Sequence, residues 1–154
     1  MSKLNEIYMR EALKEAHRAF VKDEVPVGCV AVHQGKIIGR GHNQVEMLKD
    51  PTAHAEMLAL TSAASSLGSK WLNEVSVYVT IEPCSMCAGA MVLARVKNLF
   101  YGADDPKTGA CGSVFEIAHN KKLNHRIKVT KGVLKENCAQ LLKEFFRYKR
   151  IKGK

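Results

Sequence analysis

The chain has 154 residues, of which 46% are hydrophobic and 25% are charged, and this composition is ordinary for one globular domain. The composition excludes a mostly disordered chain and a low-complexity fibre. No apolar run approaches the roughly 18 residues that a membrane-spanning helix needs, and the first residues lack the apolar stretch of a secretory signal. We therefore expect a single domain over residues 1–154, located in the cytoplasm and not bound to a membrane.

The charge of the chain is strongly basic. The 24 Lys and Arg residues outnumber the 15 Asp and Glu residues, which gives a formal net charge of +9. Half of the basic residues (12 of 24) lie in residues 121–154, where only Glu136 and Glu144 oppose them. One interpretation is a solvated basic face that aids solubility. The density of charge favours the other interpretation, which is a surface for a polyanion such as a nucleic acid.

Hydrophobic periodicity predicts helices and strands that alternate along the chain. A turn at Gln34-Gly35 joins the first two strands into a hairpin, and Thr52 is the expected N-cap of the second helix, which ends before Gly68. The expected elements, in order, are helix 4–21, strand 27–32, strand 36–41, helix 53–67, strand 75–81, helix 84–95, strand 97–102, a short helix 113–119, strand 127–130 and helix 135–152.

This order of elements predicts an α/β fold in three layers, α-β-α, with a mixed sheet of about five strands between helices. The chain contains no internal repeat and no linker-like stretch that would divide it. The expected terminal helix, at about residues 135–152, is basic and also carries apolar residues that must pack on the core.

Two short motifs carry the candidate chemistry, His54-Ala55-Glu56 and Pro83-Cys84-Ser85-Met86-Cys87, and each lies where a helix is expected to begin. Cysteines three residues apart share one face of a helical turn, so both sulfurs can reach a single ion. A helix N-terminus also favours the thiolate form. Zinc accepts sulfur and imidazole nitrogen, and a set of two Cys and one His leaves a fourth position open. We therefore expect one Zn²⁺ per chain, bound by His54, Cys84 and Cys87.

Glu56 is expected beside this ion and not as one of its ligands. Residues two apart on a helix point in different directions, so His54 and Glu56 can serve one metal region only if it lies off the helix end. The carboxylate would then act as the general acid and base that takes a proton from water activated by zinc.

Other interpretations of the two motifs carry less weight. A single His at a helix start is often structural, and one Cys-x-x-Cys pair can be redox-active or half of a four-ligand structural site. The remaining cysteines, Cys29, Cys111 and Cys138, are scattered singly and form no second pair. An odd number of cysteines in a chain with no export signal also argues against a disulfide framework.

The pattern His-x-Glu followed by Pro-Cys-x-x-Cys is the signature of zinc-dependent nucleobase deaminases. Over nearly its whole length the chain resembles the bacterial tRNA-specific adenosine deaminases, which belong to the cytidine deaminase-like superfamily. The segments that carry this resemblance are Glu24-Val25-Pro26-Val27-Gly28, the stretch from Asp50 to Glu56, the stretch from Tyr78 to Met91, the stretch from Tyr101 to Gly109, Asn124-His125-Arg126 and Phe145-Phe146-Arg147.

The resemblance implies a cytidine deaminase-like fold and a homodimer whose second subunit helps to form the RNA site. It implies hydrolytic deamination of adenosine to inosine at the wobble position of a tRNA, an arginine tRNA in particular, with release of ammonia. The tRNA anticodon loop would be the partner, and its target base must leave the stack to react.

The resemblance also implies roles for residues outside the metal cluster. The expected contacts with the flipped nucleoside come from Asn43, Glu24, Val25, Ala55 and Asp105. The expected contacts with the rest of the RNA come from Lys107, Phe145, Arg147 and Arg150. Ordinary structural roles compete with these assignments, because Asn43 and Asp105 are typical turn residues and the two adjacent phenylalanines can belong to the core.

Two other functions remain as alternatives. A deaminase of a free base or nucleoside, such as cytosine or guanine, would share the zinc site but would not need the basic C-terminal third. A non-catalytic RNA-binding module stabilised by zinc would leave Glu56 beside the metal without a purpose.

Overall fold

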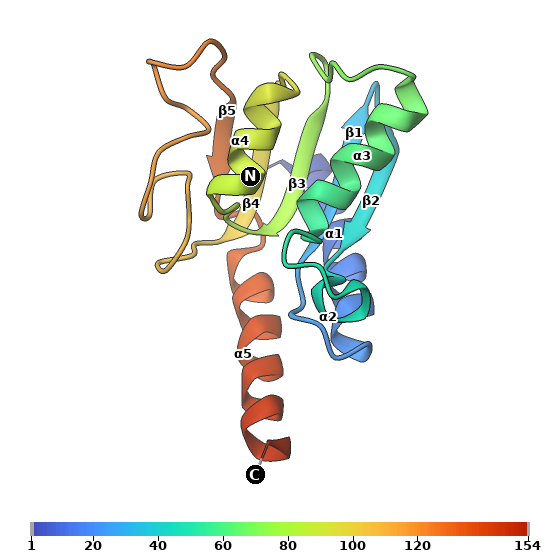
Figure 1. Ribbon diagram of the computed structural model, residues 1–154, viewed down its shortest axis with the longest axis vertical. Helices are drawn as coiled ribbons and strands as arrows, with labels where there is room; N and C mark the ends of the chain where they lie inside the picture. Colours follow the sequence, from blue (N-terminus) through green and yellow to red (C-terminus); the bar gives the residue numbers. More distant parts are fainter. Residues whose placement is uncertain (1, 154) are drawn as a thin grey trace.

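The computed structural model describes residues 2–153 and shows a five-stranded sheet with helices on both faces (Figure 1). This confirms the predicted α/β class with a mixed sheet between helices. The elements are α1 (Lys3–Val21), β1 (Gly28–His33), β2 (Lys36–His42), α2 (Val45–Leu48), α3 (Ala55–Leu67), β3 (Ser76–Ile81), α4 (Ser85–Leu93), β4 (Asn98–Ala103), β5 (Lys128–Lys131) and α5 (Lys135–Lys152).

The strands lie in the order β2-β1-β3-β4-β5, with antiparallel pairs at the β2 side and parallel pairs at the β5 side. Successive side chains of a strand point to opposite faces, and here both faces are buried. On β1, Cys29 and Ala31 belong to the core under α3 and α4, whereas Val30 and Val32 belong to the core under α1 and α5. This explains why β1 is an unbroken apolar run.

The backbones of helix α3 and strand β2 lie in close contact, and this contact fixes where α3 begins. A Cβ atom on Gly39 would meet the backbone of α3 at Ala59 and Ala63, and one on Gly41 would meet it at Ala55 and Ala59. Ala55, Ala59 and Ala63, whose backbones lie against these two glycines, are small for the same reason. Glycine and alanine have little or no side chain, so the two backbones pack directly against each other. This packing holds the first turn of α3 at one position on the sheet.

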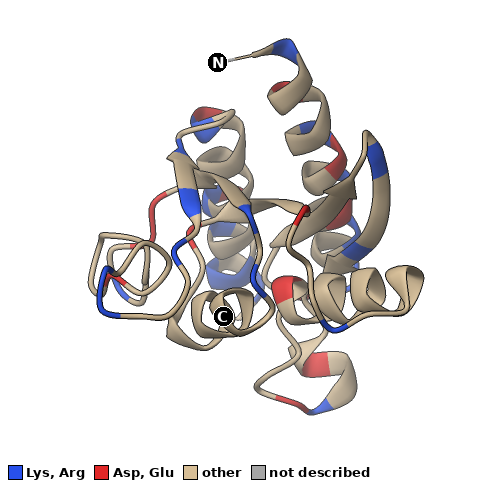
Figure 2. Cartoon of the chain, turned by 90° about the horizontal axis from the view of Figure 1, so that it is seen from above, with Lys and Arg blue, Asp and Glu red and all other residues tan. Residues whose placement is uncertain are grey.

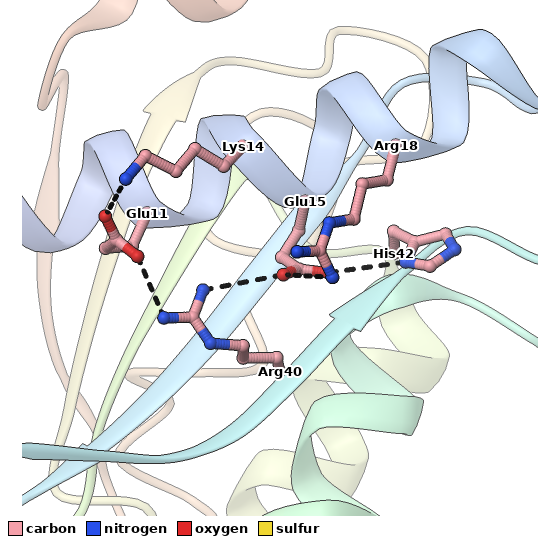
Figure 3. Close-up of polar contacts among 6 residues, drawn as sticks. All are labelled: Glu11, Lys14, Glu15, Arg18, Arg40 and His42. Carbon is pink, nitrogen blue, oxygen red and sulfur yellow. Dashed lines mark hydrogen bonds and ion pairs between the residues drawn. The ribbon is translucent and has the colours of Figure 1, made fainter.

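A network of charged side chains joins α1 to the edge strand β2 (Figure 3). Arg40 contacts Glu11 at 2.8 Å and the buried Glu15 at 3.5 Å, and the Nδ1 atom of His42 lies 3.3 Å from Glu15. A buried carboxylate is costly unless it has partners, so this network satisfies Glu15 and ties α1 to the strand that ends next to Asn43. Hydrogen bonds from Lys14 and Arg40 lower the pKa of the Glu11 carboxyl.

Two local predictions from the sequence were wrong, and one helix was missed. The N-cap of α3 is His54, because the Thr52 hydroxyl donates a hydrogen bond to Asp50 in the preceding turn. Residues 113–119 form turns instead of a short helix, since their backbone bonds run back to Gly109 and Ala110. The four-residue helix α2 was not expected at all.

In the described part of the chain, every helix is too short or too polar to cross a lipid bilayer.

The close contact between β2 and α3 generates a prediction about stability. Gly39→Ala places a methyl group against the backbone of α3, and we expect overpacking to lower the free energy of unfolding by about 1–3 kcal/mol. Gly89→Ala is the matched control, because a Cβ atom there meets nothing within 4 Å. This control should leave the stability unchanged or raise it by up to about 1 kcal/mol through helix propensity. Denaturant unfolding measures both variants, and equal effects would contradict the packing described here.

Candidate metal centre and active site

Two helix N-termini bring the candidate metal ligands together. His54 is the N-cap of α3 and Cys84 is the N-cap of α4, and both have extended backbones that turn their side chains off the helix ends. Neither side chain caps its own helix. Cys87 lies within the first turn of α4, on the same side as Cys84. Strand β3 ends just before Cys84, so the cluster lies at the carboxyl end of a central strand.

The ligand atoms have the spacing that a tetrahedral zinc ion requires. The Nδ1 atom of His54 lies 3.6 Å from the Cys84 sulfur and 3.5 Å from the Cys87 sulfur. With Zn–S bonds of about 2.3 Å and Zn–N bonds of about 2.0–2.1 Å, tetrahedral geometry separates nitrogen from sulfur by about 3.6 Å. All three ligand atoms lie within 4.8 Å of one another. In both chemistry and spacing, these residues fit a zinc ion.

The two thiols of this cluster differ in acidity. Hydrogen bonds with Cys87 and His54 lower the pKa of the Cys84 thiol to about 4. The hydrogen bond to Cys84, together with burial, raises the pKa of Cys87, and the bond to Cys84 also raises the pKa of His54. The pair therefore carries one negative charge readily and a second only with difficulty. A divalent cation supplies the positive charge that stabilises both thiolates.

Glu56 lies in the first turn of α3, two residues after His54, and is 3% exposed. Burial raises the pKa of its carboxyl group to about 7. A group with a pKa close to neutral both takes and gives a proton efficiently. A carboxyl group buried beside a metal cluster is therefore suited to proton transfer there.

Asn43 follows β2 and reaches the start of α3. Its side-chain oxygen accepts a hydrogen bond of 3.0 Å from the backbone N–H of Ala55. Its NH₂ group donates to no protein acceptor within residues 2–153, so it remains available to a ligand. Ala55 itself is fully buried, and its N–H is already used by Asn43. Of these two predicted substrate contacts, Asn43 therefore presents a side-chain donor and Ala55 does not present its amide.

The predicted pocket residue Glu24 organises the neighbouring wall of the site. It is 2% exposed, and its two carboxylate oxygens accept hydrogen bonds from the backbone N–H groups of Glu46 and Met47 at 2.9 and 2.8 Å. These bonds cap the N-terminal end of α2. Val25 is partly exposed beside it. Sequence reasoning missed α2 because four residues are too few to show a helical period.

A cavity of about 850 Å³ opens next to His54. Its walls come from the turn after α1, from α2 and from α5, and the cavity is large enough for a nucleoside. The lining residues are Lys22, Asp23, Glu24, Val25, Asn43, Val45, Glu46, Met47, His54, Phe145, Phe146 and Lys149. Three residues expected to contact the nucleoside, together with one metal ligand, thus line a single cavity.

Asp105 lies outside this cavity, in the loop that follows β4. Its carboxylate accepts hydrogen bonds from the backbone N–H groups of Lys107 and Thr108 and from the Thr108 hydroxyl. Asp105 therefore holds its own turn together, and the turn presents Lys107 to solvent. A second hollow, of about 490 Å³, is lined by Lys107 together with Phe146, Lys149 and Arg150 of α5.

The two adjacent phenylalanines of α5 have different environments. Phe145 is 3% exposed and packs edge-on against Phe20 of α1, with 5.5 Å between ring centroids. The ring of Phe145 therefore packs in the interior and meets the surface at the wall of the cavity next to His54, and its contact with RNA stays a prediction. Phe146 is 46% exposed, and Arg147 and Arg150 are exposed beside it. Lys149 lines both hollows and pairs with Asp23 at 3.0 Å.

The chain matches the family model described as MafB19-like deaminase over residues 4–150. It is 47% identical to the tRNA-specific adenosine deaminase of Bacillus subtilis, an alignment that covers 97% of this chain and 93% of that protein. It is 49% identical to the tRNA-specific adenosine deaminase of Aquifex aeolicus, with 92% and 93% covered.

Solved structures of deaminases share the fold. A structure from work on A-to-I editing by tRNA:A34 deaminases at the wobble position superposes with a TM-score of 0.84 and 40% identity, covering 88% of this chain and 98% of that one. A guanine deaminase from Nitrosomonas europaea superposes with a TM-score of 0.76 and 25% identity, covering 91% and 83%. Since curated relatives share nearly half of their residues with it over almost its full length, the chain belongs to the family of tRNA-specific adenosine deaminases.

Proposed function

We propose that the chain catalyses zinc-dependent hydrolytic deamination of adenosine to inosine at the wobble position of a tRNA, an arginine tRNA in particular. The observation that carries this proposal is the convergence of His54, Cys84 and Cys87 beside a buried Glu56, at a cavity of nucleoside size. The relatives named for tRNA adenosine deamination, at up to 49% identity, support the choice of base and of RNA.

Each residue of the site has a distinct task in this proposal. A bound zinc ion would lower the pKa of a water molecule and so supply the nucleophile. Glu56 takes a proton from the attacking water and delivers it to N1 of adenine, which makes C6 more electrophilic. Glu56 then takes the proton of the new hydroxyl group on C6 and gives it to the amino group, which leaves as ammonia, so that the ring keeps the oxygen and becomes hypoxanthine.

The cavity walls bind and orient the base. The Asn43 NH₂ group is a donor at the cavity surface, fixed in place because its oxygen is held by the start of α3. Glu24 keeps α2 in position, and Val25 supplies apolar contact. Asp105 acts by shaping the loop that faces the RNA.

The proposed RNA surface lies around the second hollow, which the exposed residues Lys107, Lys149 and Arg150 line together with Phe146, and it includes the neighbouring exposed Arg147 of α5. Figure 1 shows α5 extending beyond the sheet, so its last turns project away from the core. Figure 2 shows Lys and Arg on several elements besides α5, and only part of the charge therefore faces this hollow. A homodimer and a cytoplasmic location are further parts of this proposal.

A guanine deaminase is the second candidate, because a guanine deaminase from Nitrosomonas europaea shares the fold at 25% identity. An assay of ammonia release and inosine formation separates the two functions. Wild-type protein should form inosine in an anticodon stem-loop and release little ammonia from free guanine, cytosine or adenosine. Faster release of ammonia from a free base than from the stem-loop would overturn the RNA proposal.

The metal proposal predicts one zinc per chain. His54→Ala or Cys87→Ala removes one of three protein ligands, and we expect the purified variant to lose most of its zinc. Cys138→Ala is the matched control, since Cys138 is buried on the opposite face of the sheet and should not affect metal content. Metal analysis of the folded variants measures the outcome. Loss of zinc from Cys111→Ala would show a fourth protein ligand and contradict an open coordination position.

Glu56→Gln keeps the shape of the side chain but removes its ability to carry a proton. We expect kcat to fall by on the order of 10²–10⁴-fold, while zinc content and RNA binding are retained because Glu56 is not a ligand. The exposed Glu74→Gln variant serves as the control for a change of one carboxylate. Near-normal turnover by a folded, zinc-loaded Glu56→Gln protein would remove Glu56 from the mechanism.

The basic end of α5 should make RNA binding sensitive to salt. Replacing Arg147, Lys149 and Arg150 with Gln should flatten the log–log salt dependence of stem-loop affinity by about 0.7 for each phosphate that the variant no longer neutralises. Loss of uniform binding should also raise KM more than it lowers kcat.

The matched control replaces Lys3 of α1, Lys36 of β2 and Lys70 of the loop after α3 with Gln, which removes the same charge from residues that do not line the second hollow. If both triple variants change the salt dependence equally, net charge alone explains the binding. The proposed contact with α5 would then be wrong.

A further inference from the structure

Glu82 is a buried carboxylate that has no assigned role in the chemistry. It lies between the end of β3 and Pro83, and it is 1% exposed. Its carboxylate accepts hydrogen bonds from the backbone N–H groups of Asp105, Cys111 and Ser113, at 3.0, 2.9 and 3.1 Å, and from the Ser113 hydroxyl. Every donor comes from one loop, residues 104–113.

Within residues 2–153, no Lys, Arg or His forms an ion pair with Glu82. A buried carboxylate without a cation is stable only if hydrogen-bond donors surround it. The loop supplies them by wrapping its backbone around the carboxylate, so the conformation of the loop and the stability of the buried charge depend on each other.

The packing around Glu82 is tight on the loop side. A Cβ atom on Gly109 would overlap the Glu82 carboxylate. The N–H of Ala110 donates a bond of 2.8 Å to the carbonyl oxygen of Pro83, and Gly109 forms a β-bridge with Cys84. The loop is therefore joined directly to the segment that carries a candidate metal ligand.

The opposite side of the same loop carries the residues that face solvent. Asp105 donates its N–H to Glu82 and with its side chain closes the turn that presents Lys107. Lys107 in turn lines the hollow that it shares with Phe146 and Arg150 of α5. Asp105 thus connects the buried Glu82 carboxylate to the turn that carries Lys107 at the proposed RNA surface.

We propose that Glu82 is a positioning residue, which fixes the 104–113 loop and thereby sets where Asp105 and Lys107 meet the RNA relative to the metal centre. This inference rests on the proposed function for its effect on RNA. Glu82 does not touch the substrate and acts only through the loop.

Glu82→Gln tests this role with the smallest change. One carboxylate oxygen of Glu82 accepts from the Asp105 N–H and the Ser113 hydroxyl, and the other accepts from two backbone N–H groups. The new NH₂ group cannot accept a hydrogen bond. It therefore takes the first position, where the Ser113 hydroxyl can rotate and accept a hydrogen bond from it. The bonds from the Cys111 and Ser113 N–H groups are then kept. Only the bond from the Asp105 N–H is lost.

Amide hydrogen exchange and steady-state kinetics of the zinc-loaded protein measure the result. We expect exchange at the Asp105 amide to speed up by roughly 10-fold or more, with little change at Cys111. KM for the anticodon stem-loop should rise by roughly 10-fold, while kcat changes by less than about threefold. Glu116→Gln is the control, since its exposed carboxylate accepts a bond from His119 and none from residues 104–113.

Gly109→Ala provides a second route to the same effect, because it pushes on the carboxylate from the loop side. It should also raise KM, and its effect should be less than additive with that of Glu82→Gln.

If Asp105 exchange and KM are unchanged in Glu82→Gln, the proposal is wrong. If the variant loses zinc or mainly kcat, Glu82 positions Cys84 and the proposal is also wrong. Should the wild-type chain form no inosine, the proposed function fails, and the exchange of Asp105 still decides whether Glu82 anchors the loop.

Discussion

The site depends on one electrostatic requirement, which is that two neighbouring thiols and an imidazole share a small space at two helix N-termini. The Cys84 and Cys87 sulfurs lie 3.6 and 3.5 Å from the Nδ1 atom of His54, and the hydrogen bond between the two thiols lowers the pKa of Cys84 and raises the pKa of Cys87. A divalent ion makes the same arrangement favourable, because it stabilises both thiolates while leaving room for a fourth ligand. The surrounding structure holds these three side chains in place and puts the buried carboxyl group of Glu56, the proposed proton carrier, beside them.

The sheet and the helices α3 and α4 hold the three side chains in place. Glycines on β2 let the small-residue face of α3 lie against the strand, which fixes the height of His54 above the sheet. The parallel crossover from β3 through α4 to β4 places Cys84 at the end of a central strand. Three peripheral segments near the site, which are α2, the 104–113 loop and α5, each contact a buried residue: Glu24, Glu82 and Phe145 in turn.

The sequence was sufficient for the parts of the site that depend on local spacing. The i, i+3 cysteines and the His-x-Glu motif locate the helix starts because a helical turn brings such residues to one face. It was insufficient where tertiary contacts decide. Thr52 has the right chemistry for an N-cap, but its hydroxyl bonds to Asp50 and His54 takes the cap position. Helix α2 is capped by the remote carboxylate of Glu24, and Phe145 packs against Phe20 of the remote helix α1. No periodicity in the sequence encodes these long-range partners.

The central claim is an open, three-ligand metal centre, and zinc-edge X-ray absorption of the loaded protein tests it most directly. The account predicts two sulfur ligands at about 2.3 Å and two nitrogen or oxygen ligands at about 2.0–2.2 Å, one of them from His54 and one exchangeable with solvent. A third sulfur ligand, which would have to come from another cysteine such as Cys111, or the absence of an exchangeable ligand would contradict it.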